Sequence, residues 1–271
     1  MTIDLIERST EQGTPIELYE FTRDSQIWRY TSSDQDVTFQ GSVFLAVPIQ
    51  RPLIEQSQDP GRKPLTLTAT RSLSFAAQYV QSPPTDVVSL VIRRYHTEDI
   101  DSQTVVVWMG RVINVKFEIN EVAIRCEPIF TSLKRPALRR LYQATCPHVL
   151  YGPVCRFVRT GLQLDTSVNV TDGTSLTSVD FTGQPAGFYT GGFVEWTNEG
   201  ATDKRFILSH TGGGIIINIP FTGLEDGASV RVFPGCDHTL NTCVTKFSNE
   251  ENYGGFPYIP SKNPFSGSPI F

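Results

Sequence analysis

Four of the five cysteines of this chain form two close pairs, and this arrangement constrains the fold more than any other feature. Cys146 and Cys155 are nine positions apart, and Cys236 and Cys243 are seven positions apart. Proline and glycine stand beside both pairs, which is typical of loops. If the pairs meet in space, the segment between them must leave and return at the same place. An inserted domain does this, because the ends of a domain usually lie close together.

Length and charge exclude several classes of protein. The 271 residues are enough for two domains with buried cores, and 23 basic against 28 acidic side chains give a net charge of -5. An acidic chain lacks the basic face that binds phosphates, so we expect no specific nucleic-acid binding. No stretch approaches the roughly 20 apolar residues of a membrane-spanning helix, so we expect no membrane segment.

The first seven residues do not contain a basic region followed by an apolar one, so we do not expect a secretion signal. The protein is then made and kept in a cytoplasm until a larger assembly carries it out. In that reducing compartment, the cysteines are not expected to form structural disulfides.

The N-terminal part, residues 1–130, has the patterns of β-strands and is predicted to be one β-rich domain. Residues 65–70 alternate strictly between apolar and polar side chains, as a half-buried strand does. Residues 104–117 and 122–128 flank a polar turn and predict a long hairpin, and residues 37–49 predict a second hairpin or a bulge around Gly41. The fold class is therefore mainly β.

One helix is predicted, at residues 132–142. Ala137, Leu138 and Leu141 would share one face, and Pro136 is acceptable in the first turn, where its missing N–H costs nothing. The helix is expected to end near Cys146. Its basic side chains favour a solvated face over a contact with an acidic partner.

The segment between the cysteine pairs, residues 161–233, is predicted to be an inserted β domain. Glycine- and threonine-rich turns separate its strand candidates, which are residues 168–170, 192–196, 205–208, 214–219 and 229–233. The flanking segments, 131–160 and 234–271, form the cysteine-bearing loop and helix region. The last residues, 247–271, are rich in proline and aromatic side chains and are expected to lie across another surface or to be mobile.

Three interpretations of the paired cysteines stay open on residue chemistry alone. Buried unpaired thiols would not explain the clustering in loops. Structural zinc sites usually use cysteines two to four residues apart, which is closer than either pair here. A [4Fe–4S] cluster accepts four thiolates at irregular spacing, and its larger size suits longer spacers. The spacing favours the iron–sulfur cluster over zinc.

The remaining thiol and two histidines have simpler interpretations. His148 and His238 each follow the first cysteine of a pair by two positions, but neither Cys155 nor Cys243 is followed by the histidine that a Rieske-type site needs. We expect the histidines to lie beside the sulfurs or in solvent rather than to bind metal. Cys126 lies on the inward face of a strand and is expected to belong to the core.

The C-terminal motifs resemble a known family. The cysteine pairs around a β insertion, followed by Cys243-Val244-Thr245-Lys246-Phe247-Ser248-Asn249 and by Asn252-Tyr253-Gly254-Gly255-Phe256-Pro257-Tyr258-Ile259-Pro260, resemble the phage BR0599-type tail-tip hub proteins. These are similar to the tail tip assembly protein L of lambda-like phages and to hub proteins of gene transfer agents. The resemblance is specific from Cys146 to about Pro264 and vaguer before it.

The resemblance implies a structural role without enzymatic activity. In the lambda-like members, four C-terminal cysteines hold a [4Fe–4S] cluster, and the matching positions are Cys146, Cys155, Cys236 and Cys243. The family implies a homotrimeric ring at the tail tip that joins the distal tail protein ring to the central fibre or receptor-binding hub protein. The protein would then be assembled in the bacterial host cytoplasm and reside in the virion.

The alternatives to an iron–sulfur hub are a structural zinc-binding hub and a tail-associated cell-wall hydrolase. The hydrolase is disfavoured because the sequence has no Gly-x-Ser-x-Gly, His-Glu-x-x-His or P-loop pattern. A cysteine peptidase would need a cysteine with a partner histidine, and His148 and His238 lie within the proposed ligand loops.

Overall fold

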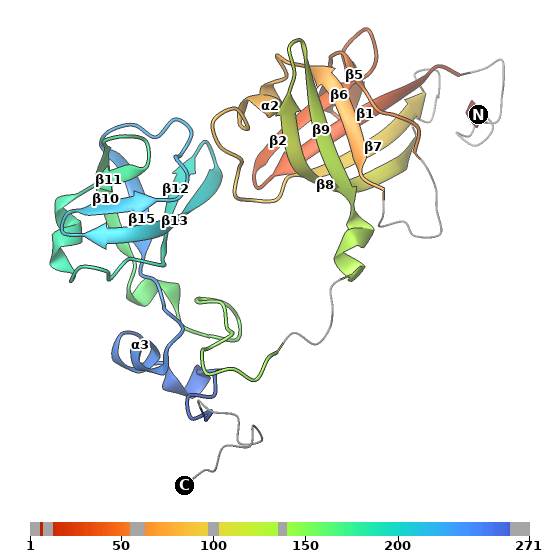
Figure 1. Cartoon of the computed structure of the whole chain (residues 1–271). Helices are drawn as coiled ribbons and strands as arrows, with labels where there is room; N and C mark the ends of the chain where they lie inside the picture. Colours follow the sequence, from red (N-terminus) through yellow and green to blue (C-terminus); the bar gives the residue numbers. More distant parts are fainter. Residues whose placement is uncertain (1–5, 8–12, 55–62, 97–102, 135–139, 261–271) are drawn as a thin grey trace. The chain divides into compact units, whose positions relative to one another are not determined.

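A computed structural model (Figure 1) describes residues 6–7, 13–54, 63–96, 103–134 and 140–260. The chain divides into two compact units, the first made of residues 1–135 and 197–203 and the second of residues 136–196 and 204–271. Strands dominate both, so the mainly β fold class is confirmed. Among the described residues, no helix has the length and apolar character needed to span a lipid bilayer. The three-part division of the chain stays a prediction.

The first unit contains a nine-stranded sheet with the order β3-β4-β2-β1-β7-β8-β9-β6-β5. Neighbouring strands are antiparallel, except that β2 and β4 are parallel. The predicted hairpins are confirmed, as β3–β4 around Gly41 and as β8–β9. The strands are β1 (Pro15–Arg23), β2 (Gln26–Thr31), β3 (Val37–Phe39), β4 (Ser42–Ala46), β5 (Ile49–Gln50), β6 (Leu65–Thr70), β7 (Ser89–His96), β8 (Thr104–Phe117) and β9 (Glu121–Pro128).

Alternation along these strands builds the core of the first unit. In β9, every second residue from Val122 to Cys126 is fully buried, and β6 buries Leu65 and Leu67 against it. The short helix α2 (Ser74–Ala77) adds Phe75 to this core. Cys126 is a core residue as expected, and its burial raises the pKa of its thiol far above the ordinary value.

The second unit contains a closed six-stranded barrel with the order β10-β11-β14-β13-β12-β15. Its interior is filled by apolar side chains such as Leu176, Phe181, Val194 and Ile207, all fully buried. The strand candidates of the sequence are all present, and the three-residue strand β11 is an addition. The strands are β10 (Leu164–Val170), β11 (Ser175–Thr177), β12 (Phe193–Asn198), β13 (Ala201–Thr211), β14 (Gly214–Ile217) and β15 (Ala228–Phe233).

The helix predicted at 132–142 is wrong wherever the structure describes it. Residues Ile129–Lys134 form a 3₁₀ helix, residues 135–139, with Ala137 and Leu138, lie outside the described residues, and residues 140–146 are not helical. Leu141 is 67% exposed, so it offers no buried face that would stabilise a helix. The backbone at Gln143 instead accepts a hydrogen bond from the N–H of Phe256.

One helix of the cysteine region was not predicted. The helix α3 (Leu240–Thr245) carries Cys243, and the hydroxyl of Thr239 caps its first turn by accepting a hydrogen bond from the N–H of Thr242. Such a side-chain acceptor satisfies one of the free N–H groups at a helix start. Six residues are too few to show a helical apolar period.

Candidate metal centre

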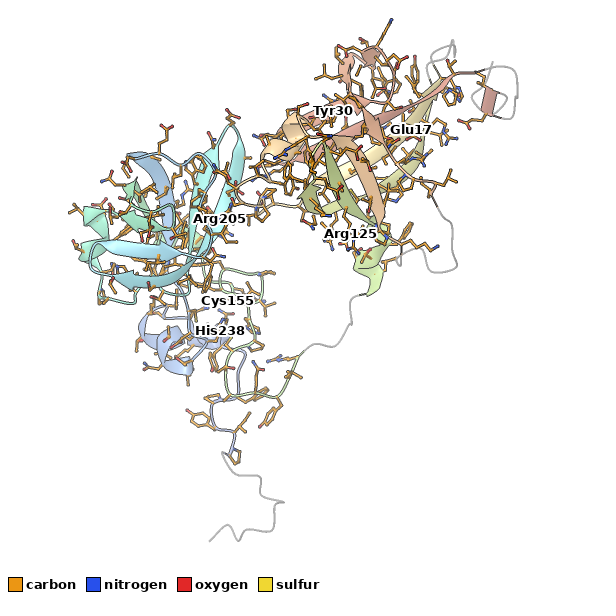
Figure 2. The ribbon with its side chains drawn as sticks, turned by 45° about the horizontal axis from the view of Figure 1, so that its top comes forward. Glu17, Tyr30, Arg125, Cys155, Arg205 and His238 are labelled. Carbon is orange, nitrogen blue, oxygen red and sulfur yellow. The ribbon has the colours of Figure 1, made fainter. Side chains whose placement is uncertain are left out.

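The structure brings the four cysteines of the two pairs to one small cavity of the second unit. Its volume is about 20 Å³, roughly the space of one water molecule. Figure 2 labels Cys155 and His238 from the two segments that meet there. None of the cysteines forms a disulfide. The cavity is lined by Cys146, His148, Leu150, Cys155, Cys236, His238, Thr239, Cys243, Phe247, Asn249, Asn252 and Tyr253.

Aromatic packing holds the first cysteine segment against the barrel. The hydroxyl of Tyr151 donates a 2.8 Å hydrogen bond to the carbonyl of Pro234, just before Cys236. The ring of Tyr151 meets Phe193 and Phe233 edge-on, each at 5.8 Å between centroids. Residues around position 151 are therefore fixed relative to the strands β12 and β15, and β15 leads to the second cysteine segment.

A half-buried lysine, Lys246, holds the second cysteine segment. The Nζ of Lys246, just after α3, donates hydrogen bonds to the carbonyls of Phe188 and Gly235 and lies 4.4 Å from the centre of the Phe188 ring. Burial lowers the pKa of Lys246, while the nearby Cys236 and Asp237 favour its charged form. The lysine therefore ties α3 to two loops of the barrel.

Backbone N–H groups point at two of the sulfurs. The N–H of Gly254 lies 3.4 Å from Cys146 Sγ, and the N–H of His238 lies 3.3 Å from Cys236 Sγ. The sulfurs of Cys155 and Cys243 both contact Asn249. Donors of this kind stabilise thiolates and adjust the potential of a bound cluster.

The thiols also interact electrostatically. Burial is the largest cause that raises the pKa of Cys243 to about 11, and the charges of Cys236, Cys146 and Cys155 raise it further. The pKa of Cys236 is raised for the same reasons, against the effect of the N–H of His238. Several thiolates in one place repel one another, and a bound cation would remove that cost.

The two histidines lie on the wall of the cavity. The Nδ1 of His148 is 3.1 Å from the carbonyl of Asn252, and a side chain at Gly254 would overlap the imidazole of His148. The backbone of His238, at φ 62°, links the pairs, because its carbonyl accepts a 2.8 Å hydrogen bond from the N–H of Cys146. His148 and His238 therefore have structural contacts of their own.

The donor set fits a metal group that prefers sulfur. Four thiols suit zinc or an iron–sulfur cluster, whereas magnesium and calcium prefer oxygen. Among the described residues, no group of three or more Cys, His, Asp and Glu side chains is arranged to hold a single metal ion. The four cysteines line one cavity, so their thiols can serve as one ligand set.

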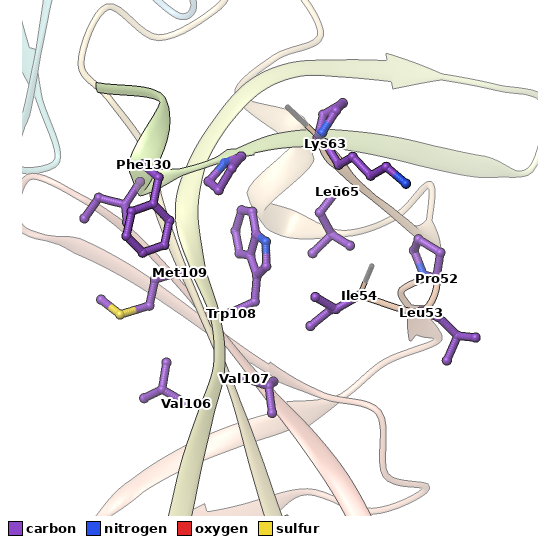
Figure 3. A pocket seen from close by; sticks show the side chains of 13 residues that line it. Pro52, Leu53, Ile54, Lys63, Leu65, Val106, Val107, Trp108, Met109 and Phe130 are labelled. Atoms are coloured by element: carbon purple, nitrogen blue, oxygen red, sulfur yellow. The ribbon is translucent and has the colours of Figure 1, made fainter. Parts of the chain in front are cut away.

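A larger cavity lies in the first unit and has different chemistry. It measures about 590 Å³ and is walled by apolar side chains, among them Trp108, Met109 and Phe130 (Figure 3). Lys63 is the one ionisable side chain among the described residues of this wall. No sequence pattern predicted this cavity, because its residues come from four separate segments. It offers a surface for apolar contacts rather than for acid–base chemistry.

Comparison with known proteins identifies the family. Residues 8–158, more than half of the chain, match the family described as baseplate hub protein, N-terminal attachment domain. The chain belongs to this family of baseplate hub proteins. Residues 187–263 of this hub protein also match the family described as phage conserved hypothetical protein BR0599, so the resemblance seen in the sequence is confirmed.

Two known proteins are similar to this baseplate hub protein. A chain of the virion of a native gene transfer agent particle has the same fold, with a TM-score of 0.86 over 99% of this chain and 96% of that one at 18% identity. An uncharacterised protein of Xylella fastidiosa (strain 9a5c) is 30% identical over 163 residues. The match covers 56% of this chain, which spans about a third (34%) of that relative's length. The hub protein is a structural component of the virion tail.

Proposed function

We propose that this hub protein carries a structural [4Fe–4S] cluster on Cys146, Cys155, Cys236 and Cys243. The observation that carries the proposal is that four thiols from two distant segments line one cavity. The cluster would supply iron–thiolate bonds that tie the start of the cysteine region to its end. The described part of this region has a six-residue helix and short 3₁₀ turns and no strands, so metal ligation would replace a large apolar core.

Zinc is the alternative group for the same four thiols. A structural zinc ion needs its four ligands around one point at about 2.3 Å from the metal. Among the described residues, no group of three or more possible ligands is arranged to hold a single ion, and backbone N–H groups approach Cys146 and Cys236 in the way that suits cluster ligands. These two observations support the cluster over zinc.

We also propose that three copies form a ring at the tail tip, between the distal tail protein ring and the central fibre or receptor-binding hub protein. The proposal rests on the resemblance to tail-tip hub proteins. The apolar cavity of the first unit supports it, because Met109, Ile129 and Phe130 on its wall are each about half exposed. Apolar side chains gathered in this way are typical of interaction surfaces. Light scattering on the purified full chain would measure the copy number.

Metal analysis after anaerobic purification tests the cluster. We expect the full chain to be brown and to contain iron and acid-labile sulfide. Cys236→Ser should lose both. Cys126→Ser is the matched control, because Cys126 is buried in the core of the first unit and should leave the iron content unchanged. If the chain contains one zinc ion per molecule and no iron, the four thiols form a zinc site and not a cluster. A colourless protein free of both metals would refute the proposal.

A further inference from the structure

The two cysteine pairs are linked through one residue, Asn249. Its Nδ2 donates a 2.7 Å hydrogen bond to the carbonyl of Cys155 and lies 3.5 Å from Cys155 Sγ. Its backbone carbonyl accepts from Cys243 Sγ at 3.2 Å, and its backbone N–H donates to the carbonyl of Cys243 at 3.0 Å. Asn249 therefore contacts the second cysteine of each pair, on both the backbone and the sulfur.

The orientation of the Asn249 amide is fixed from both sides. Its Oδ1 accepts a 2.7 Å hydrogen bond from the Nδ2 of Asn252, so the Nδ2 of Asn249 must face Cys155. A flipped amide would set two donors against each other and an oxygen against the carbonyl of Cys155. The backbone of Asn252 in turn accepts from His148, so this amide belongs to the wall of the cavity.

We infer that Asn249 is a positioning residue that sets the separation of Cys155 and Cys243 before metal arrives and donates an N–H to the sulfur of Cys155. The inference rests on the proposed metal site. An asparagine is required for a chemical reason, because the position needs a donor toward Cys155 and an acceptor toward Asn252 on one short side chain. Aspartate has the same shape but offers only acceptors.

Asn249→Asp is the sharpest test, with Asn241→Asp as its control. Asn241 is an exposed asparagine of α3, so both variants add one negative charge to the same region. Ferrous and ferric iron with sulfide, added without oxygen to the metal-free chain, serve as the probe, because iron–thiolate bonds give charge-transfer absorption. Residues that orient metal ligands typically change affinity by about 10- to 100-fold. We expect the Asn249→Asp chain to bind iron weaker by that factor, with an altered charge-transfer spectrum, and Asn241→Asp to match the original chain.

A second measurement on the metal-free full chain separates the two proposals. The rate at which a thiol reagent labels the four site cysteines should rise in Asn249→Asp and in Asn249→Ser, while circular dichroism shows the barrel intact. Labelling and iron binding equal to those of the Asn241→Asp control would overturn the role of Asn249. If the unsubstituted chain binds no metal, the proposed metal site fails, whereas faster labelling of the Asn249 variants would still support Asn249 as the link between the pairs.

Discussion

Gly235 immediately precedes Cys236, and replacing it with alanine should displace that cysteine. A Cβ at this position would overlap the carbonyl oxygen of Thr190 and the backbone of Gly191 and Gly192. The backbones of Gly235 and Gly192 pack closely from both sides, because a Cβ at Gly192 would lie 2.8 Å from the nitrogen of Gly235. Since the obstructing atoms belong to the backbone, no side-chain rotation can relieve the overlap.

The expected cost follows from two contributions. Forcing an extra methyl group into a packed site typically costs about 1–3 kcal/mol. Moving Gly235 also disturbs its carbonyl, which accepts a 2.7 Å hydrogen bond from Lys246, and hydrogen bonds to charged groups contribute about 1.5–3 kcal/mol. The two contributions together amount to about 2.5–6 kcal/mol. At about 2–4 °C per kcal/mol for about 150–250 residues, and more for a smaller unit, the Tm of the second unit should fall by at least about 5 °C.

Calorimetry of the full chain after anaerobic purification measures this effect, together with the metal content. Gly183→Ala is the control, since a Cβ at Gly183 would meet nothing within 4 Å and its φ is not in the left-handed region. We expect Gly183→Ala to unfold like the unsubstituted chain, and Gly235→Ala to unfold earlier and to hold less metal. If Gly235→Ala retained the Tm and the metal content of the control, close backbone packing would not be what positions Cys236.

Three further predictions concern other parts of the molecule. Phe181→Ala should destabilise the barrel by about 3–5 kcal/mol in urea unfolding, because the ring is fully buried; a loss under 1 kcal/mol would mean that the barrel repacks. Lys246→Met should cost about 1.5–3 kcal/mol through two lost hydrogen bonds, whereas Lys116→Met, at an exposed site, should cost little. Burial raises the pKa of Glu7, but hydrogen bonds from His96 and Arg94 outweigh it and lower the pKa below 4.5. The stabilisation by Glu7 is therefore present above pH 4.5 and is lost as the pH falls through the lowered pKa. In a chain with Glu7→Gln, the free energy of unfolding should depend less on pH in this acidic range.

The strands were predictable because their signal is local. The alternation of residues 65–70 appears as the buried and exposed sides of β6, and the polar turn at residues 118–121 joins β8 to β9. The four clustered cysteines were also found from spacing alone. Each of these signals lies within a few neighbouring residues, and neighbouring residues are what a sequence pattern reports.

The rest of the site depends on contacts between distant residues. Lys246 and Asn249 look like ordinary polar side chains in the sequence, and their roles come from partners such as Phe188 and Cys155. The predicted helix failed for the same reason. The backbone near Gln143 pairs with residues more than a hundred positions later, and a local pattern contains no trace of that partner.

The barrel itself explains why the two cysteine pairs meet. Its first and last strands are antiparallel neighbours, with Leu164 opposite Val232, so the chain leaves the barrel beside the point where it enters. Only short connections then separate Cys155 from Leu164 and Val232 from Cys236. The entropy of closing the long loop between the pairs is thus offset by the folding of the barrel rather than by metal ligation. It follows that the length of the insertion between β10 and β15 is free to vary, whereas the pairing of these two strands is not.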